Sequence, residues 1–366
     1  YFDNSWAGLI FDRITNKKDR NDIFNLIEKK MLNRTNVDFN EEYLMNLSHS
    51  LEEKLKKQLY DLSKKNNIKM IYSVNIEIDG DERSVASHFS ANKVCFCEKY
   101  RYEMPECKRT SRFRPVIVGF GPAGMFSALI LAHAGLRPIV IERGNDVDTR
   151  TKDVYGFWTS RRLNTASNVQ FGAGGAGTFS DGKLTTRISD PRCSFVTEKM
   201  IEFGAPKDIA TKAKPHIGTD YLKTVVKNIR DEIISLGGEV RFNTVLTDIE
   251  TANGAVCAAE FKELNGSACC VGCKTLVLAT GHSSRDTYAM LYQKGFKMAK
   301  KPFSVGVRIE HKRKYINLLQ YKDEYLAESL PAADYKLSCH PNGRGVYTFC
   351  MCPGGTVVCG SSESGG

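Results

Sequence analysis

Gly119-Phe120-Gly121-Pro122-Ala123-Gly124 follows an apolar run at Val116–Val118, and a second apolar run at Ile139–Ile141 leads directly to Glu142. Gly119 permits a tight turn, Gly121 lets a phosphate approach the backbone, and Gly124 lets a helix pack close to the strand. The free N–H groups at the start of a helix over Pro122–Ala134 favour an anion. Glu142 can accept hydrogen bonds from both hydroxyls of a ribose. This order of elements predicts dinucleotide binding, with a glycine turn that merely packs as the alternative.

The size and charge of the chain fit a globular α/β protein. Its 366 residues are enough for two domains with a sizeable core, and 42% of them are hydrophobic. No apolar run in the sequence approaches the ~20 residues of a membrane helix, so we expect no membrane partner. The net charge of +10 favours phosphate-bearing cofactors. Because no basic stripe is interleaved with aromatic residues, we expect no nucleic-acid partner.

The cysteines favour a reducing compartment. Their number, 12, raises the alternatives of disulfides or metal, but the chain is too large for a disulfide scaffold. We therefore expect reduced thiols, in the cytoplasm or in an organellar stroma or matrix. Cys269-Cys270-x-x-Cys273 resembles half a zinc site without a second pair at the required spacing, so we predict no metal. A redox role for Cys350 and Cys352 stays an alternative, although a strand separates such thiols more than a disulfide favours.

Both ends of the sequence look cut. The chain begins at Tyr1 and not at Met, and it ends at Gly365-Gly366 after a strand-like stretch. We expect any targeting segment to lie outside this sequence, and we expect truncation at the C-terminus.

The patterns divide the chain into four consecutive parts. Residues 1–98 predict a small α+β domain, and residues 99–114 predict a charged linker. The alternative for the linker is that its arginines contact a partner or a phosphate. Residues 115–290 predict a nucleotide-binding domain with insertions. Residues 291–366 predict a substrate-side segment.

Local periodicities predict individual elements in these parts. Glu41–Asn66 carries leucines at helical spacing, and Ile68–Ile78 alternates as a strand. Thr219 or Asp220 caps another helix, with Leu222, Val225, Val226, Ile229 and Ile233 on one face. Gly237-Gly238 ends this helix.

A β-meander is expected after that helix. Glu239–Leu246, Ala255–Phe261 and the run from Ala268 are its strands, and Asn253-Gly254 and Asn265-Gly266 supply the tight turns. The predicted fold class is therefore α/β, with a Rossmann-like dinucleotide-binding fold and a β-meander.

Two further strands are expected downstream of the meander. Leu276–Ala279 is a short, fully apolar strand that ends at Thr280-Gly281, as expected for a strand returning to an open α/β sheet. Phe303–His311 alternates as a strand of a substrate-side sheet.

Several long motifs carry a resemblance to a known family. Besides the glycine motif with Glu142, they are Gly174–Leu184 (GGAGTFSDGKL), Lys214–Asp220 (KPHIGTD), Gly281–Asp286 (GHSSRD) and Phe349–Gly355 (FCMCPGG). Together they resemble the FAD-dependent dehydrogenases, also described as NAD(FAD)-utilising oxidoreductases, of the glutathione-reductase-like FAD-binding superfamily. The similarity runs from about Arg114 to the end. The physiological substrate of this family is generally unassigned.

The resemblance implies FAD as the cofactor and NAD(P)H as a candidate reductant. The residues assigned to the cofactor are Gly119, Gly121, Pro122, Ala123, Gly124, Glu142, Arg143, Arg150, Gly175, Ala176, Gly177, Thr178, Ser180, Asp181, Val245, Ala279, Thr280 and Gly281. Among these, the backbone near Val245 would contact the adenine, and Ala279–Gly281 would lie by the pyrophosphate. Two departures from the family are the absence of a late Gly-Asp element after Gly281 and the presence of Ala173 where an acidic residue is expected.

The glycine-rich loop Gly172–Lys183 predicts contact with a flavin ring, because glycine backbones can approach a flat ring closely. A flexible surface loop is the alternative, and the flanking Phe171 and Phe179 argue against it. Arg150 follows Glu142 closely, and contact with the pyrophosphate or a solvated position at a helix start are equally open for it.

The candidate catalytic residues are His282, His216, Arg308 and Lys183. Histidine titrates near neutrality, and His282 adjoins the cofactor-side glycine, so it is preferred over His216; a structural hydrogen bond is the default role of each. Arg308 suits an anionic substrate, with pairing to Glu310 or another carboxylate as the alternative.

The leading functional hypothesis is an FAD-dependent oxidoreductase that transfers hydride or electrons between a small-molecule substrate and flavin. A single glycine motif makes a separate NADPH-binding domain unexpected. The alternative is an FAD-binding structural or regulatory protein that acts through its N-terminal domain. Flavin-dependent RNA modification is a third hypothesis without direct support in the sequence, and the residues predict no oligomeric state.

Overall fold

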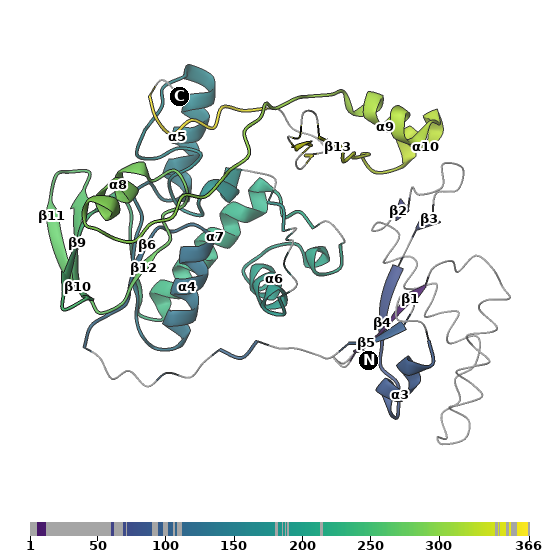
Figure 1. The fold of residues 1–366 in the computed structure, drawn as a ribbon, viewed down its shortest axis with the longest axis horizontal. Helices are drawn as coiled ribbons and strands as arrows, with labels where there is room; N and C mark the ends of the chain where they lie inside the picture. The colour runs from purple at the N-terminus through teal and green to yellow at the C-terminus, as the bar shows by residue number, and fades with distance from the viewer. Residues whose placement is uncertain are drawn as a thin grey trace. The chain divides into compact units, whose positions relative to one another are not determined.

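A computed structural model gives the fold of the chain (Figure 1). The structure describes residues 6–11, 60–61, 69–70, 72–89, 94–97, 102–104, 107, 112–179, 182–184, 186, 188, 190–212, 215–340, 343, 345–348, 351–352 and 357–364. The chain divides into two compact units. One comprises Tyr1–Tyr102, Arg187–Phe195 and Ala210–Pro215, and the other comprises Glu103–Thr186, Val196–Ile209 and His216–Gly366. The predicted boundaries at residues 98, 114 and 290 stay predictions.

The first unit contains a small antiparallel sheet with strand order β4-β1-β5. Its strands are β1 (Trp6–Phe11), β4 (Tyr72–Ile76) and β5 (Val94–Cys97). Helix α3 (Glu82–Ser87) begins at Asp81, whose side chain accepts hydrogen bonds from the N–H groups of Arg83 and Ser84. Ala86 of α3 is buried against Val94 of β5. The described part of this unit is thus α+β.

The sequence prediction is wrong at one place in this unit. Tyr60–Asp61, the last part of the helix expected over Glu41–Asn66, forms strand β2, which pairs antiparallel with β3 (Lys69–Met70). Pairing of the backbone with a neighbouring strand overrides the local leucine period here. The rest of that expected helix lies outside the described residues.

A parallel sheet forms the centre of the second unit, with strand order β12-β6-β7-β8. Its strands are β6 (Val116–Val118), β7 (Ile139–Ile141), β8 (Glu239–Arg241) and β12 (Leu276–Leu278), and all three pairings are parallel. The chain runs from β6 through β7 to β8, and then returns to the other side of β6 with β12. The apolar runs that flank the glycine motif therefore form the strands that the sequence predicts, and the α/β fold class is confirmed.

Layers of structure cover both faces of this sheet (Figure 1), and they bury its apolar side chains. Ile117 and Val140 pack with helices α4 (Pro122–His133) and α7 (Thr219–Ser235). Their strand neighbours Val116, Val118, Ile139 and Ile141 point to the opposite face and pack with the meander and with α8 (Arg285–Gln293). This alternation explains why β6 and β7 are apolar at every position.

Helix α7 buries the same five residues that its sequence pattern predicts, Leu222, Val225, Val226, Ile229 and Ile233. Its N-cap is Gly218, with φ of 87° and no capping side chain, so the expected cap at Thr219 or Asp220 is wrong. Gly237, with φ of 82°, follows the last turn and ends the helix as predicted.

The meander consists of β9 (Thr244–Ala252), β10 (Ala255–Glu263) and β11 (Ala268–Gly272), paired antiparallel in this order. Asn253 has φ of 52° and Gly254 has φ of 76°, as the predicted tight turn requires. The run expected as one strand over Glu239–Leu246 is split, because Asn243 adopts φ of 55° and breaks it. Its first part is β8 of the parallel sheet, and its second part begins the meander.

Further helices precede and follow these layers. Helices α5 (Val147–Ser160) and α6 (Arg192–Glu202) and the 3-10 turns η1 (Ala176–Phe179) and η2 (Lys207–Ala210) lie between β7 and α7 in the chain. The segment after α8 contains α9 (Arg313–Tyr321), α10 (Glu324–Ser329) and the short strands β13 (Ser338–Cys339) and β14 (Val346–Tyr347), which pair antiparallel. None of the helices formed by the described residues combines the length and apolarity needed to cross a bilayer.

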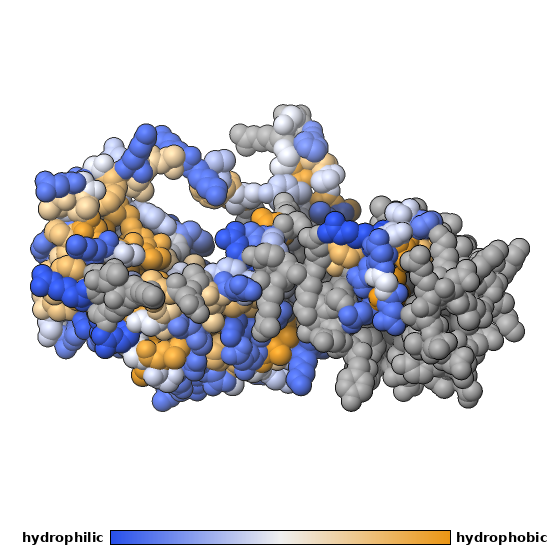
Figure 2. All heavy atoms as spheres, turned by 90° about the horizontal axis from the view of Figure 1, so that it is seen from below, coloured by the Kyte–Doolittle hydropathy of each residue, from blue (hydrophilic) through white to orange (hydrophobic). Residues whose placement is uncertain are grey.

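The strand expected over Phe303–His311 is wrong, because these residues have no regular secondary structure. Its apolar side chains, Phe303, Val305, Val307 and Ile309, are between 71% and 95% exposed. A strand needs a hydrogen-bonding partner as well as an alternating pattern, and no described strand pairs with this segment. On the face drawn in Figure 2, hydrophilic residues are interspersed with hydrophobic ones.

The close packing of α4 on the glycine turn gives a first testable prediction. A Cβ at Gly124 would lie 1.9 Å from the carbonyl oxygen of Gly119, whereas a Cβ at Gly156 in α5 would meet no described heavy atom within 4 Å. We expect Gly124→Ala to lower the free energy of unfolding by at least about 1–3 kcal/mol. Gly156→Ala is the matched control, and it should raise this free energy by about 0.5–1 kcal/mol through helix propensity. Urea unfolding measures both changes. A Gly124→Ala variant with the wild-type free energy of unfolding would contradict the close packing of α4 on the glycine turn.

Candidate functional site

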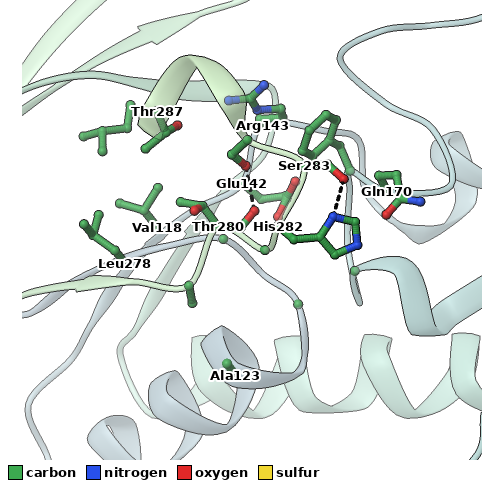
Figure 3. Close-up of a pocket in the computed structure, with 18 of the residues that line it drawn as sticks. Val118, Ala123, Glu142, Arg143, Gln170, Leu278, Thr280, His282, Ser283 and Thr287 are labelled. Carbon is green, nitrogen blue, oxygen red and sulfur yellow. Dashed lines mark hydrogen bonds between the residues drawn. The ribbon is translucent and has the colours of Figure 1, made fainter. Parts of the chain in front are cut away.

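A cavity of about 520 Å³ lies at the carboxyl ends of β6, β7 and β12, within the usual range for ligand pockets. This is the edge at which open α/β sheets bind ligands, where the chain reverses its direction of winding. Figure 3 shows several residues of its wall. The wall is formed by Val118, Gly119, Gly121, Pro122, Ala123, Ile141, Glu142, Arg143, Gln170, Phe171, Gly172, Gly175, Ala176, Gly177, Thr244, Leu246, Leu278, Ala279, Thr280, Gly281, His282, Ser283, Ser284, Thr287, Tyr288 and Leu291.

The first and third glycines of the motif make the close contacts that the sequence predicts. Gly119 has φ of 104°, and a Cβ there would lie 2.3 Å from the carbonyl oxygen of Ala279. Gly124 faces Gly119 so closely that no side chain fits between α4 and the turn. Only glycine satisfies both the backbone conformation at residue 119 and the approach of β6 to β12.

Helix α4 begins at the cavity without a capping side chain. Its N-cap is Gly121, Pro122 is its first residue, and no acidic residue lies in its first turn. Gly175 lies opposite, since a Cβ at residue 175 would be 2.9 Å from the Cα of Gly121. The start of α4 thus presents backbone N–H groups and a positive dipole end to the cavity, which favours an anion there.

Glu142 is 5% exposed and ties three backbone segments together. Its Oε2 accepts a hydrogen bond from the N–H of Phe120 at 2.7 Å. Its Oε1 accepts from the N–H groups of Gly144 and Gly172, both at 2.9 Å. A carboxylate offers about four acceptor positions, so the described backbone groups leave about one for a ligand. Contact with a ribose stays a prediction, and the structural role is an addition that the sequence did not reveal.

Arg150 is fully buried, so the expectation of a solvated helix-start arginine is wrong. Its guanidinium donates to the carbonyl oxygens of Asn168 at 2.9 Å, Val169 at 3.0 Å, Gly172 at 3.2 Å and Ala173 at 2.6 Å. Burial lowers the pKa of Arg150 to about 10, and the charge of Glu142 opposes this shift. The described wall of the cavity does not include Arg150. Its predicted contact with a pyrophosphate therefore stays a prediction.

The glycine-rich loop is buried at both ends of its described part, Gly172–Gly174 and Thr178–Phe179, so the alternative of a surface loop is wrong for these residues. Gly172, Ala173 and Gly174 are buried, and Gly174 donates to the carbonyl oxygen of Phe120 at 2.8 Å. Gly175, Ala176 and Gly177 line the cavity, and their contact with the cofactor stays a prediction.

The remaining predicted residues of this loop do not contribute to the described wall. The hydroxyl of Thr178 is buried and donates to the carbonyl oxygen of Ala173 at 3.3 Å. Ser180 and Asp181 lie outside the described residues. Contact of the loop with a flavin ring stays a prediction.

Arg143 lines the cavity and is held by two neighbours. Its Nη2 donates to both carboxylate oxygens of Asp286 at 2.8 Å, and its guanidinium lies 4.5 Å from the ring centroid of Phe171. Burial raises the pKa of Asp286, but the hydrogen bond and the charge of Arg143 lower it by more. The pKa of Asp286 therefore lies below its ordinary value. This ion pair connects β7 with α8 at the rim.

The turn after β12 lies at the wall, and its predicted position by a pyrophosphate stays a prediction. Ala279, Thr280 and Gly281 all line the cavity. Ser284 donates to the carbonyl oxygen of Thr280 at 2.6 Å, and Tyr288 donates to that of Gly281 at 2.7 Å. The start of α8 therefore holds this turn in place.

The residue expected at the adenine, Val245, is flanked by two wall residues. Thr244 and Leu246 line the cavity, because alternate side chains of β9 point in the same direction. The described wall does not include the side chain of Val245. Its predicted backbone contact stays a prediction.

Of the four candidate catalytic residues, the structure brings only His282 to the described wall. Its Nδ1 lies 2.9 Å from the hydroxyl of Ser283, as Figure 3 shows. Lys183 donates to the carbonyl oxygen of Met351 and pairs through its backbone with His216. Arg308 donates to the carbonyl oxygen of Val358 at 2.9 Å, which is a main-chain contact and not the carboxylate pair given as the alternative, and its contact with an anionic substrate stays a prediction.

Several wall residues were not predicted to bind the cofactor. Gln170 and Phe171 precede the predicted loop Gly172–Lys183, Leu278 precedes the predicted Ala279, and Ser283 and Ser284 lie within the quoted Gly281–Asp286 motif. Proximity to these motifs was the available signal for them. Thr287, Tyr288 and Leu291 had no such signal, because the position of α8 over the sheet is a tertiary feature.

The cysteines give no metal site in the described part of the chain, where no group of three or more His, Cys, Asp and Glu side chains is placed to hold a metal ion. Cys95 and Cys97 point the same way in β5, with their sulfur atoms 3.8 Å apart. Cys350, one member of the predicted redox pair, lies outside the described residues.

The sequence is similar to one protein family over its C-terminal segment and to a bacterial protein over most of its length. Residues 302–366 match the family described as "FAD-dependent protein, C-terminal domain-like". An uncharacterised protein of Clostridium beijerinckii is 48% identical over 347 residues, which is 94% of this chain and 62% of that protein. The chain thus spans 62% of the length of this relative.

Solved structures with partial similarity include three proteins. Thermovibrio ammonificans THI4 has a TM-score of 0.35 and 19% identity, with 50% of this chain and 64% of that chain covered. A flavoprotein/dehydrogenase from Cytophaga hutchinsonii has values of 0.31 and 15%, with 49% and 42% covered. Glycerol-3-phosphate dehydrogenase from Bacillus halodurans, complexed with FAD, has values of 0.31 and 13%, with 49% and 36% covered. These TM-scores and identities are too low to transfer an activity to this chain.

The Arg143–Asp286 pair predicts a pH-dependent contribution to stability. Because the folded pKa of Asp286 lies below its unfolded value of about 3.9, the contribution is complete above that value and is lost as the pH falls through the folded pKa. At pH 7 we expect Asp286→Asn to lower the free energy of unfolding by up to about 1 kcal/mol, since the carboxylate is partly exposed. Urea unfolding from pH 7 to pH 3 should show this difference shrinking. A difference that stays constant over this range would contradict the interpretation.

Proposed function

We propose that the protein is an FAD-dependent oxidoreductase that transfers hydride or electrons between a small-molecule substrate and flavin. The observation that carries the proposal is the start of α4, which has no capping side chain. Its N-cap Gly121 lies against Gly175, and both line the same cavity as Glu142. An anion-binding helix start beside a buried acidic residue at the end of the next strand suits the phosphates and ribose of a dinucleotide. The match of residues 302–366 to an FAD-dependent family favours FAD among the dinucleotides.

The residues present fit the parts of FAD. The pyrophosphate would be held by the N–H groups that begin α4, beside the side-chain-free backbones of Gly121 and Gly175 in the cavity wall. The ribose would use the remaining acceptor position of Glu142. Thr244 and Leu246 would flank the adenine, and the glycine-rich residues Gly175–Gly177 would lie along the cofactor.

His282 is the residue to which we assign proton transfer. FAD, when bound, supplies the acceptor or donor of the electron pair. The Nδ1 of His282 is engaged by the Ser283 hydroxyl, so Nε2 is the atom that would give or take the proton. His216, Lys183 and Arg308 are weaker candidates, because the described wall of the cavity includes none of them.

The reaction partners are proposed on narrower grounds. NAD(P)H is a candidate reductant, by resemblance to NAD(FAD)-utilising oxidoreductases alone. The chain has one glycine motif of this kind, so a nicotinamide cofactor would have to bind without a second domain of the same type. No observation on the described residues favours the alternative of an FAD-binding regulatory protein.

The test of this proposal is the visible spectrum of the purified chain and of the supernatant released by heating, with Gly121→Asp beside it. Gly121 has φ of −80°, and a Cβ there would meet Gly175 at an ordinary 3.7 Å, so the variant should fold. Its carboxylate would stand at the start of α4 and repel the pyrophosphate. We expect a flavin spectrum in the wild type and FAD affinity at least about 10-fold weaker in the variant, equivalent to about 1.4 kcal/mol.

Gly121→Ala is the matched control, because its methyl group adds bulk without charge. It should bind FAD more weakly than the wild type, because Gly121 lets the phosphate approach the backbone, but more tightly than Gly121→Asp. The difference in affinity between the two variants measures the effect of the charge. A wild-type chain that is colourless and gains no thermal stability from added FAD would overturn the proposal for this chain.

A further inference from the structure

The segment Asn168–Ala173, called here the 168–173 loop, forms one wall of the cavity through Gln170, Phe171 and Gly172. It contains no helix or strand, so its carbonyl groups have no ladder to join. Arg150 of α5 satisfies them instead, with hydrogen bonds to the carbonyl oxygens of residues 168, 169, 172 and 173. A single side chain therefore fixes both ends of the loop.

Burial of this arginine is expensive unless its charge is compensated. Arg150 is 0% exposed, and moving a cation out of water costs several kcal/mol. Four carbonyl dipoles and the charge of Glu142 offset this cost, while the ring centroid of Phe179 lies 4.9 Å from the guanidinium. An apolar side chain would fill the same space without that cost. The arginine is thus better explained by the loop conformation that it imposes than by packing.

Glu142 holds the same loop from the opposite side. Gly172 donates its N–H to Glu142, and its carbonyl oxygen accepts from Arg150. A Cβ at Gly172 would lie 2.3 Å from the Cδ of Arg150, and a Cβ at Gly144 would lie 2.6 Å from the Cα of Gly172. Gly172 is fixed by hydrogen bonds on both sides and by contact distances that admit no side chain.

The middle of the loop is fixed locally. The side-chain oxygen of Asn168 accepts from the N–H groups of Gln170 at 2.9 Å and Phe171 at 3.2 Å. The ring of Phe171 then lies under the guanidinium of Arg143. These hydrogen bonds and the ring contact define the conformation of the middle of the loop.

We infer that Arg150 is a positioning residue, which presents the 168–173 loop to the cofactor without touching the cofactor itself. This inference rests on the proposed function for the identity of the ligand. Its physical content is preorganisation: a ligand that meets a formed wall does not have to order the wall on binding. Without Arg150 the loop would occupy the binding conformation for only a fraction of the time, and the apparent Kd would rise by the inverse of that fraction.

The first test compares FAD binding in Arg150→Met, Arg150→Lys and wild type, followed by flavin fluorescence at a temperature far below each Tm. If the loop is formed for about one-tenth to one-hundredth of the time without the guanidinium, Arg150→Met should bind FAD about 10- to 100-fold more weakly. Arg150→Lys should fall in between, because an ammonium has three donors but lacks the planar fork. Ile233→Ala is the matched control: it removes a fully buried side chain from α7 and should lower stability with less than about a 2-fold change in Kd.

Chemical rescue separates positioning from general damage. In Arg150→Ala, guanidinium at millimolar concentration should strengthen FAD binding several-fold, whereas sodium chloride at the same ionic strength should not. Ile233→Ala should show no rescue. Wild-type-like FAD binding by Arg150→Met, or rescue equal in both salts, would overturn the inference.

Hydrogen exchange tests the loop when no cofactor is bound, and so separates this inference from the proposed function. The N–H groups of Gly172, Ala173 and Gly174 are bonded to Glu142, the carbonyl of Asn145 and the carbonyl of Phe120. They should exchange faster in Arg150→Lys than in a control of equal global stability. If wild type fails to bind FAD but this exchange is accelerated, the ligand is wrong and the positioning role stands. If the exchange is unchanged, the positioning role is wrong whatever the ligand.

Discussion

The carboxylate of Glu142 is the interaction on which the site depends, because this one side chain joins three backbone segments beside the cavity. It accepts N–H groups from Phe120 in the glycine turn, from Gly144 after β7, and from Gly172 in the 168–173 loop. A buried carboxylate is unfavourable unless its lone pairs are satisfied, and three backbone donors provide this. The removal of Glu142 would leave those three donors unpaired beside the cavity, at about 1–3 kcal/mol each where they stay buried.

The layers of the second unit explain why the cavity lies where it does. The side chains of β6 and β7 alternate between the α4–α7 face and the meander face, so both faces of the sheet are occupied by packed structure. The described cavity lies at the carboxyl ends of the strands, outside these two packed faces. The strand order reverses at β6, because β12 returns to the side of β6 that faces away from β7. The absence of a Cβ at Gly119 lets the carboxyl ends of β6 and β12 approach each other.

The sequence predicted the features that short-range patterns determine. The glycine turn, β6, β7 and the five buried residues of α7 each follow from a local spacing that has one structural solution. Phe303–His311 shows where this fails, because alternation defines a face but supplies no partner strand. The single strand predicted over Glu239–Leu246 is divided in the structure, and this division also depends on tertiary structure. The first residues of the run form β8 and pair with β7, which no local pattern indicates. The positions of Gln170 and Tyr288 in the wall depended on loop and helix placement that no local spacing encodes.

Charged residues near the glycine motif were the hardest to assign from sequence, because ligand contact and backbone contact require the same residue types. Arg150 donates four hydrogen bonds to main-chain carbonyls, and a guanidinium has five N–H groups, so bonds to the described residues leave at most about one for a ligand. Glu142 is filled to a similar degree, yet it also lies in the cavity wall, whereas Arg150 does not. Both side chains are therefore bound mainly by backbone groups, and they differ in their access to the cavity. In this site, buried charges shape the backbone, and the backbone, bare at its glycines, faces the ligand.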